Sequence, residues 1–241
     1  MTKRSGKAGG NKSSRGGGAP GGLRGARNMH VRVKTAKGRT TSQKAWLQRQ
    51  LNDPYVVAAK EAGLRSRAAF KLAEIDDRYS FIKKGHAVLD LGCAPGGWCQ
   101  VSRERVGPKG RVLGVDLQEV DAIPGVDIML LDFMDDDAVE KILEKLDGKV
   151  NVVLSDMAAS SSGHRQTDHL KIMALCEAAL EFAIEILADG GSFCAKVLHG
   201  GTEQELLREM RKHFVTVRHV KPQASRKDSS EMYVLAMGFK G

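Results

Sequence analysis

Two lysines and two acidic residues, far apart in the chain, are the side chains best suited to chemistry: Lys71, Asp156, Lys196 and Glu231. Lys196 lies inside the apolar run SFCAKVL, where an ammonium group is costly to bury unless it is paired or functional. Asp156 follows the apolar run NVVLS, and Glu231 opens the last apolar run of the chain. The alternative for Lys196 is an amine that reaches solvent from the edge of the fold. We expect the four side chains to meet in one buried cluster.

Such a cluster suits methyl transfer to a ribose hydroxyl. A 2′-hydroxyl is a poor nucleophile while protonated, so its oxygen must lose the proton as it attacks a sulfonium donor in line. A lysine amine accepts that proton only when its pKa is low, and burial next to a second ammonium lowers the pKa of such an amine. Lys71 would supply the second ammonium, while Asp156 and Glu231 would orient the amines and the hydroxyl. This scheme requires no metal ion.

A glycine-rich turn, LDLGCAPGGW at residues 89–98, follows an apolar run and opens a helix. Its glycines would let the backbone and the N–H groups of the helix approach a ligand closely. Pro95 and the pair Gly96-Gly97 replace the G-x-G-x-x-G pattern, which disfavours a nucleotide-dependent oxidoreductase. An ordinary turn between a strand and a helix is the alternative for this segment taken alone.

Two acids downstream of the glycine turn strengthen the prediction of a nucleotide-type ligand. Asp116 ends the second predicted strand of this unit, about 20 residues past the turn, where an acid accepts hydrogen bonds from ribose hydroxyls. Asp132 ends the third strand and could accept a hydrogen bond from an adenine amino group. Both lie at carboxyl ends of strands, where open α/β sheets bind their ligands. Either acid alone could equally be a solvated residue at a strand end.

The elements that must position these residues alternate between strands and helices from residue 86 onward. Before them, helices are predicted at 41–51, at 55–62 and after a Ser66 cap. The predicted strands are 86–91, 111–116, 128–131, 150–155, 192–198, 215–220 and 231–239, and the predicted helices are 97–105, 136–146, 168–187 (ended by Gly190-Gly191) and 204–213. This alternation predicts a doubly wound α/β sheet with right-handed crossovers.

The positive charge of the chain is concentrated at its beginning. The net charge is +9, yet residues 1–44 hold 12 of the 38 Lys and Arg and no Asp or Glu, which leaves 26 basic against 29 acidic residues. Residues 1–40 are rich in Gly, Ser, Lys and Arg and are predicted to be a disordered basic tail, which can neutralise RNA phosphates without reading sequence. A solvated extension without function is the alternative. Residues 41–241 form the predicted domain, with a helical N-terminal segment.

Further exclusions come from hydropathy and cysteine spacing. The sequence has no apolar stretch of signal-peptide or membrane-span length, so we expect a soluble, cytoplasmic protein that does not engage a membrane. No pair of its four cysteines has C-x-x-C spacing, which argues against zinc and redox roles. Basic residues near Lys71 and Glu231 are expected to border the site and to position RNA phosphates, with simple solubilising charge as the alternative: Arg65, Arg67, Lys221, Arg226 and Lys227.

Five ordered segments resemble the motifs of the FtsJ-type ribosomal RNA 2′-O-methyltransferases: RSRAAFKLAEID, VLDLGCAPGGW, VLSDMA, SFCAKVL and SSEMYVLAMG. The resemblance covers roughly residues 40–240. It implies a Rossmann-like methyltransferase fold that uses S-adenosylmethionine, with a mostly parallel, doubly wound sheet and an antiparallel last strand. By resemblance, Gly96, Trp98, Asp116, Asp132 and Asp156 would contact the cofactor, and Lys196 would be the proton acceptor within the Lys71–Asp156–Lys196–Glu231 tetrad.

The bacterial branch of that family methylates a uridine ribose in the 23S ribosomal RNA of the large subunit, which implies the same substrate and partner here. We expect a monomer. Two alternatives remain open: a transfer RNA ribose methyltransferase, and a catalytically silent RNA-binding protein that keeps the fold. A binding module would have no use for Lys196 within a strand, which favours the enzyme.

Overall fold

The computed structural model describes residues 38, 40–158, 163–198, 203–226 and 228–241, so almost all of the predicted tail at 1–40 lies outside the described residues. The described part contains a single seven-stranded sheet with the strand order β3-β2-β1-β4-β5-β7-β6. Its strands are β1 (Ala87–Leu91), β2 (Arg111–Asp116), β3 (Asp127–Leu130), β4 (Val150–Ser155), β5 (Leu187–Leu198), β6 (Phe214–Val220) and β7 (Glu231–Phe239). The pairs among β1 to β5 are parallel, whereas β7 runs antiparallel to both β5 and β6. This Rossmann-like arrangement confirms the predicted fold class.

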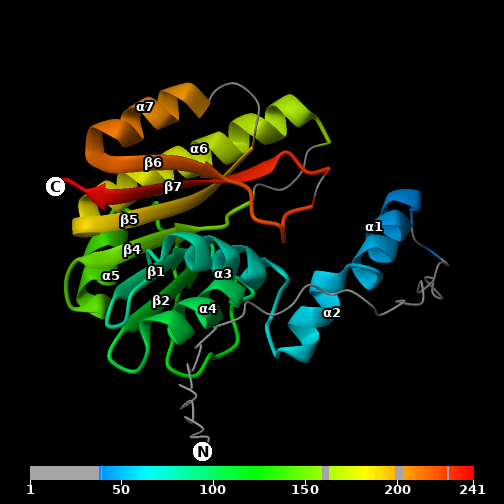
Figure 1. Ribbon diagram of the computed structural model, residues 1–241, viewed down its shortest axis with the longest axis horizontal. Coiled ribbons are helices and arrows are strands. Elements are labelled where there is room, and N and C mark those ends of the chain that lie inside the picture. Colours follow the sequence, from blue (N-terminus) through cyan, green and yellow to red (C-terminus); the bar gives the residue numbers. More distant parts are fainter. Residues whose placement is uncertain (1–37, 39, 159–162, 199–202, 227) are drawn as a thin grey trace, which may run out of the picture.

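Helices cover both faces of the sheet, as Figure 1 shows. Residues of β1 alternate between the two resulting cores: Val88 belongs to the core that includes α3 and α4, and Leu89 and Leu91 belong to the core that includes α5, α6 and α7. Continuous apolar strands are required because both faces are covered. The helices are α1 (Thr41–Leu51), α2 (Pro54–Glu61), α3 (Ala68–Tyr79), α4 (Gly97–Val106), α5 (Ala138–Leu146), α6 (Arg165–Ile186) and α7 (Glu203–His213).

Most predicted elements occur within one or two residues of their expected bounds, but two details of the prediction were wrong. Ser66 does not cap the third helix: α3 begins after Arg67, without a side-chain cap, and the Ser66 hydroxyl has no hydrogen-bond partner. Gly190 and Gly191 do not end α6, because the chain turns extended at Leu187 and both glycines lie within β5. No helix among the described residues is long and apolar enough to cross a membrane.

Candidate active site

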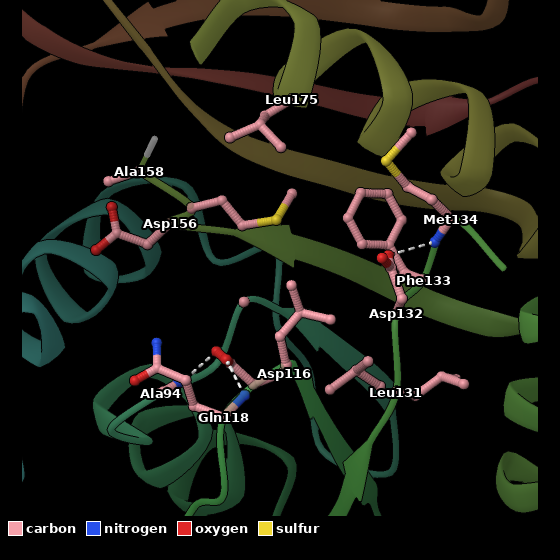
Figure 2. Close-up of a pocket in the computed structure, with 14 residues that line it drawn as sticks. Ala94, Asp116, Gln118, Leu131, Asp132, Phe133, Met134, Asp156, Ala158 and Leu175 are labelled. Carbon is pink, nitrogen blue, oxygen red and sulfur yellow. Dashed lines mark hydrogen bonds between the residues drawn. The ribbon is translucent and has the colours of Figure 1, made fainter. Parts of the chain in front are cut away.

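A cavity of about 440 Å³ opens at the carboxyl ends of the strands, where the strand order reverses direction between β1 and β4. Open α/β sheets bind their ligands at this kind of crossover. Figure 2 shows the side chains of the cavity, which come from the glycine turn, the ends of β2 and β4, the segment after β3, and α6. The lining residues are Gly92, Ala94, Val115, Asp116, Leu117, Gln118, Leu131, Asp132, Phe133, Met134, Asp156, Met157, Ala158 and Leu175.

The glycine turn forms one wall of this cavity. Gly92 has a φ of +70°, and a Cβ atom there would lie 2.2 Å from Cγ of Met157. Only glycine therefore fits this position, because any side chain would clash with the segment after β4 and strain the backbone. The turn is tied to the end of β2 by Asp116, which accepts hydrogen bonds from the backbone N–H of Ala94 at 2.8 Å and of Gln118 at 2.9 Å (Figure 2).

Two of the predicted cofactor-binding acids, Asp116 and Asp132, line the cavity from neighbouring strands. Asp132 follows β3 and accepts a hydrogen bond from the backbone N–H of Met134 at 3.0 Å (Figure 2). Each carboxylate oxygen keeps a second lone pair, so these acids can still accept hydrogen bonds from a ligand. Asp156, the third predicted acid, lines the same cavity from the end of β4.

Gly96 and Trp98, also predicted to bind the cofactor, are not among the lining residues of this cavity. The Trp98 ring is buried, packs 5.6 Å from the ring of Tyr233, and donates from Nε1 to the carbonyl of Ala68 at 2.8 Å. Both residues lie at the beginning of α4, whose first backbone N–H groups have no acceptor within the helix. Their role towards a cofactor stays a prediction that depends on these N–H groups rather than on the indole.

The four residues of the predicted tetrad meet in space. Lys196 Nζ lies 2.6 Å from the backbone carbonyl of Asp156 and 3.0 Å from its Oδ1. Lys71 Nζ lies 2.8 Å from the carboxylate of Glu231 and 3.8 Å from Oδ2 of Asp156. Both lysines are buried, with 9% and 8% of their surface exposed for Lys71 and Lys196. The alternative of a solvent-reaching Lys196 is therefore wrong.

The sheet register explains this convergence. Lys196 of β5 pairs with Tyr233 of β7, and Leu198 pairs with Glu231, so one face of two adjacent strands carries both Lys196 and Glu231. Lys71 approaches from α3. The pKa of Glu231 reflects two opposing effects: burial raises it, but the charge and hydrogen bond of Lys71, with smaller help from Lys196 and Ser225, bring it below the ordinary value. Glu231 is thus held as a carboxylate.

Tyr233 is a member of this cluster that the sequence reasoning missed. Its hydroxyl donates to Oδ1 of Asp156 at 2.7 Å, and Lys71 Nζ lies 5.6 Å from the centre of its ring. Burial, and then the negative charge of Asp156, raise the pKa of Tyr233 well above its ordinary value, so the phenol stays a donor. Only its place in the motif SSEMYVLAMG pointed to it, because nothing in a sequence reveals where a phenol points.

Asp90, within the glycine-turn motif, is a second residue that was not singled out. It is buried, and it accepts a hydrogen bond from the Cys99 thiol at 3.2 Å and from the Cys99 backbone. Burial raises the pKa of Asp90 to about 7, and the charges of Asp156 and Asp116 add to the rise. A carboxyl group behind the glycine turn therefore fixes the start of α4 next to the cavity.

The basic residues expected around the tetrad have different roles. Arg67 and Arg226 line a smaller cavity together with Lys71 and Glu231. Arg65 does not: its guanidinium donates to the carbonyls of Pro95, Asp121 and Ala122, which ties the glycine turn to the loop after β2. Lys221 donates to the carbonyl of Ser229, and Lys227 lies outside the described residues.

A mostly parallel sheet with an antiparallel β7, a cavity at its crossover and a buried Lys–Asp–Lys–Glu cluster beside it define a Rossmann-like methyltransferase. Residues 64–239 match the family described as FtsJ-like methyltransferase, and the chain belongs to that family.

Named relatives agree with this assignment. A protein of Parvibaculum lavamentivorans called ribosomal RNA large subunit methyltransferase E is 60% identical over 247 residues, which cover 98% of this chain and 95% of the relative. A protein of the same name from Cereibacter sphaeroides is 58% identical, over 90% of this chain and 93% of its own. A crystal structure from Plasmodium falciparum, provisionally described as a ribosomal RNA methyltransferase, superimposes with a TM-score of 0.67 at 33% identity, covering 73% of this chain and 99% of its own.

Proposed function

We propose that this protein transfers a methyl group from S-adenosylmethionine to the 2′-oxygen of a uridine ribose in the 23S RNA of the large ribosomal subunit. The observation that carries the proposal is that the Lys196 amine contacts both the backbone carbonyl and the carboxylate of Asp156, a residue that lines a cofactor-sized cavity. The names of the 60% and 58% identical relatives support large-subunit ribosomal RNA as the substrate.

The residues of the cavity fit S-adenosylmethionine. Its adenosine would find apolar surface from Leu117, Leu131 and Phe133, and its hydroxyl and amino groups would find the acceptors Asp116 and Asp132. The positively charged end of the cofactor would face Asp156, in agreement with charge complementarity. When bound, the cofactor supplies an electrophilic methyl group on a sulfonium.

Lys196 would remove the proton from the attacking hydroxyl. A deprotonated lysine amine, the form that acts as a general base, has two N–H bonds and one lone pair. The two oxygens of Asp156 at 2.6 and 3.0 Å accept the two N–H bonds, and the lone pair is left for the hydroxyl proton. Lys71, bound to Glu231 at 2.8 Å, would stabilise the negative charge that develops on the 2′-oxygen. Tyr233 would hold the Asp156 carboxylate in place through its 2.7 Å hydrogen bond to Oδ1.

The test is the chemical identity of the product. Large-subunit RNA from cells that lack this protein would be incubated with the protein and S-adenosylmethionine, digested to nucleosides and analysed by mass spectrometry. We expect 2′-O-methyluridine, with transfer RNA from the same cells unmodified in parallel. A methyl group on a base would contradict ribose chemistry, modification of the transfer RNA alone would favour the transfer RNA alternative, and no methylated product would favour a silent RNA-binding protein.

A further inference from the structure

A second, smaller cavity of about 170 Å³ adjoins the tetrad on the side away from the cofactor cavity. Lys71 and Glu231 line this second cavity, whereas Asp156 lines the cofactor cavity, so the tetrad separates the two. We call it the basic cavity; its lining residues are Gln50, Arg67, Lys71, Arg226, Ser229 and Glu231. They come from α1, from the start of α3, and from the loop before β7 together with the first residue of that strand, which are three separate parts of the chain.

A buried aspartate fixes the two arginines of the basic cavity. Asp53 caps α2 by accepting from the Tyr55 N–H at 3.0 Å with Oδ1, and its Oδ2 accepts from Arg67 and, at 3.5 Å, from Arg226. Arg67 also donates to the carbonyl of Ala224. One carboxylate therefore holds two guanidinium groups in place while it caps a helix.

The lining of the basic cavity carries more positive than negative charge. Arg67, Lys71 and Arg226 line it with three positive charges, and Glu231 is its one acidic lining residue. Asp53, which pairs with both arginines, and Asp156, 3.8 Å from Lys71, are not among the lining residues. Arg226 is the more accessible of the two arginines, because 34% of its side chain is exposed, against 15% for Arg67. A guanidinium has five N–H donors, so Arg226 has several left for an anion. Gln50 and Ser229 add further polar groups to the wall.

We propose that the basic cavity binds a backbone phosphodiester of the substrate RNA next to the target ribose, with Arg226 as the principal contact. This inference rests on the proposed ribose chemistry. The 2′ and 3′ oxygens of a ribose lie on adjacent carbon atoms, so a 2′-oxygen at the tetrad brings a phosphodiester close to it. The basic cavity is the positively charged space beside the tetrad, and the bidentate geometry of arginine suits a phosphate. Such a contact fixes the register of the RNA without reading its sequence.

The alternative is a purely structural role, in which Arg226 only ties its loop to Asp53. The two roles predict different results for Arg226→Ala. A phosphate contact contributes about one unit to the slope of log Kd against log salt concentration, whereas a structural tie changes the melting temperature and leaves the slope unaltered. Arg208→Ala is a matched control, because Arg208 is exposed on α7, away from α1 and α2 (Figure 1), and the charge change is the same.

The experiment measures binding of large-subunit RNA, isolated from cells lacking the protein, at salt concentrations from about 50 to 200 mM. We expect Arg226→Ala to flatten the slope by about one unit and to weaken binding about tenfold, while Arg208→Ala keeps the wild-type slope. Arg226→Lys should restore the slope but only part of the affinity, because it keeps the charge and loses the bidentate geometry. A wild-type slope for Arg226→Ala would overturn the inference.

Two readouts keep the outcomes separate. The thermal shift caused by S-adenosylmethionine shows whether each variant is folded, and Arg226→Gln serves as a second variant if the alanine substitution unfolds the loop. Ribose methylation by the wild-type protein tests the proposed function alone. If the wild-type protein methylates ribose and Arg226→Ala keeps the wild-type salt slope, only the phosphate site is contradicted. If Arg226→Ala flattens the slope but the wild-type protein does not methylate ribose, the proposed reaction is contradicted and the anion site stands.

Discussion

The amine of Lys196 contacts Asp156 twice, at 2.6 Å from the backbone carbonyl and at 3.0 Å from Oδ1 of the side chain. A single residue thus fixes both the position and the rotation of the amine. Because Asp156 also lines the cofactor cavity, the same residue links the amine to the place where a methyl donor would lie. The geometry of the proposed reaction therefore depends on the short segment after β4.

Tyr233→Phe should lower stability more than it lowers activity. The substitution removes the 2.7 Å hydrogen bond to Asp156, and a bond to a charged acceptor contributes about 1.5–3 kcal/mol to the free energy of unfolding. Lys196 still holds Asp156, so we expect turnover to fall by less than about tenfold. Urea unfolding and methylation rates of the two proteins check this. An unchanged unfolding midpoint would show that the hydroxyl bond contributes nothing.

Asp90 should make stability depend on pH. Its pKa in the folded protein, about 7, is above the unfolded value of 3.8, so the folded state binds the extra proton between these values. Stability from this group is then lost as pH rises towards 7, by roughly 2–3 kcal/mol between pH 5 and pH 8. Asp90→Asn carries no charge and should show a correspondingly smaller loss. Parallel stability–pH curves for the two proteins, measured in urea, would contradict this assignment.

Asp116→Asn should weaken cofactor binding. Asp116 offers acceptor oxygens to the cavity while it holds the glycine turn through Ala94 and Gln118. Loss of the charge should reduce affinity for S-adenosylmethionine by about tenfold, since a hydrogen bond to a charged group is worth 1.5–3 kcal/mol. Isothermal titration calorimetry measures the effect. Asp127→Asn, in the exposed part of β3, is the control and should bind like the wild type. Equal affinities for all three proteins would exclude Asp116 from the cofactor site.

Removal of residues 1–40 should weaken RNA binding and flatten its salt dependence, because this segment carries many basic residues and no acidic ones. Affinity for S-adenosylmethionine should stay the same, since the described cofactor cavity uses none of these residues. Filter binding at several salt concentrations measures the slope. If the shortened protein gave the wild-type slope, the tail would have no part in phosphate binding.

The sequence was most informative where a residue's role depends on local pattern. The apolar runs predicted β2, β4 and β7 at their observed bounds, and an ammonium inside a further apolar run, which lies in β5, marked Lys196. Local pattern was misleading at the start of α3. Serine is a common helix cap, so Ser66 was predicted to cap α3, but the helix begins after Arg67 without a side-chain cap.

Roles that depend on distant contacts could not be predicted. Tyr233 and Asp156 are 77 residues apart, and Asp53 and Arg226 are 173 apart, so neither pair leaves a mark in any short stretch of sequence. The placement of Trp98 is of the same kind: its ring packs into the core beside Tyr233 and away from the cofactor cavity, because α3 and β7 surround it. The register between β5 and β7 places Tyr233 opposite Lys196, and that register follows from the complete sheet.

The methylation rate of Lys196→Ala tests the central claim most directly. Under single-turnover conditions with large-subunit RNA, we expect the rate to fall by at least about 10²-fold, the usual contribution of a general base, while the thermal shift by S-adenosylmethionine stays at the wild-type value. Lys141→Ala, an exposed lysine of α5, should leave the rate unchanged. A Lys196→Ala protein that methylates ribose at the wild-type rate would contradict the assignment of the base.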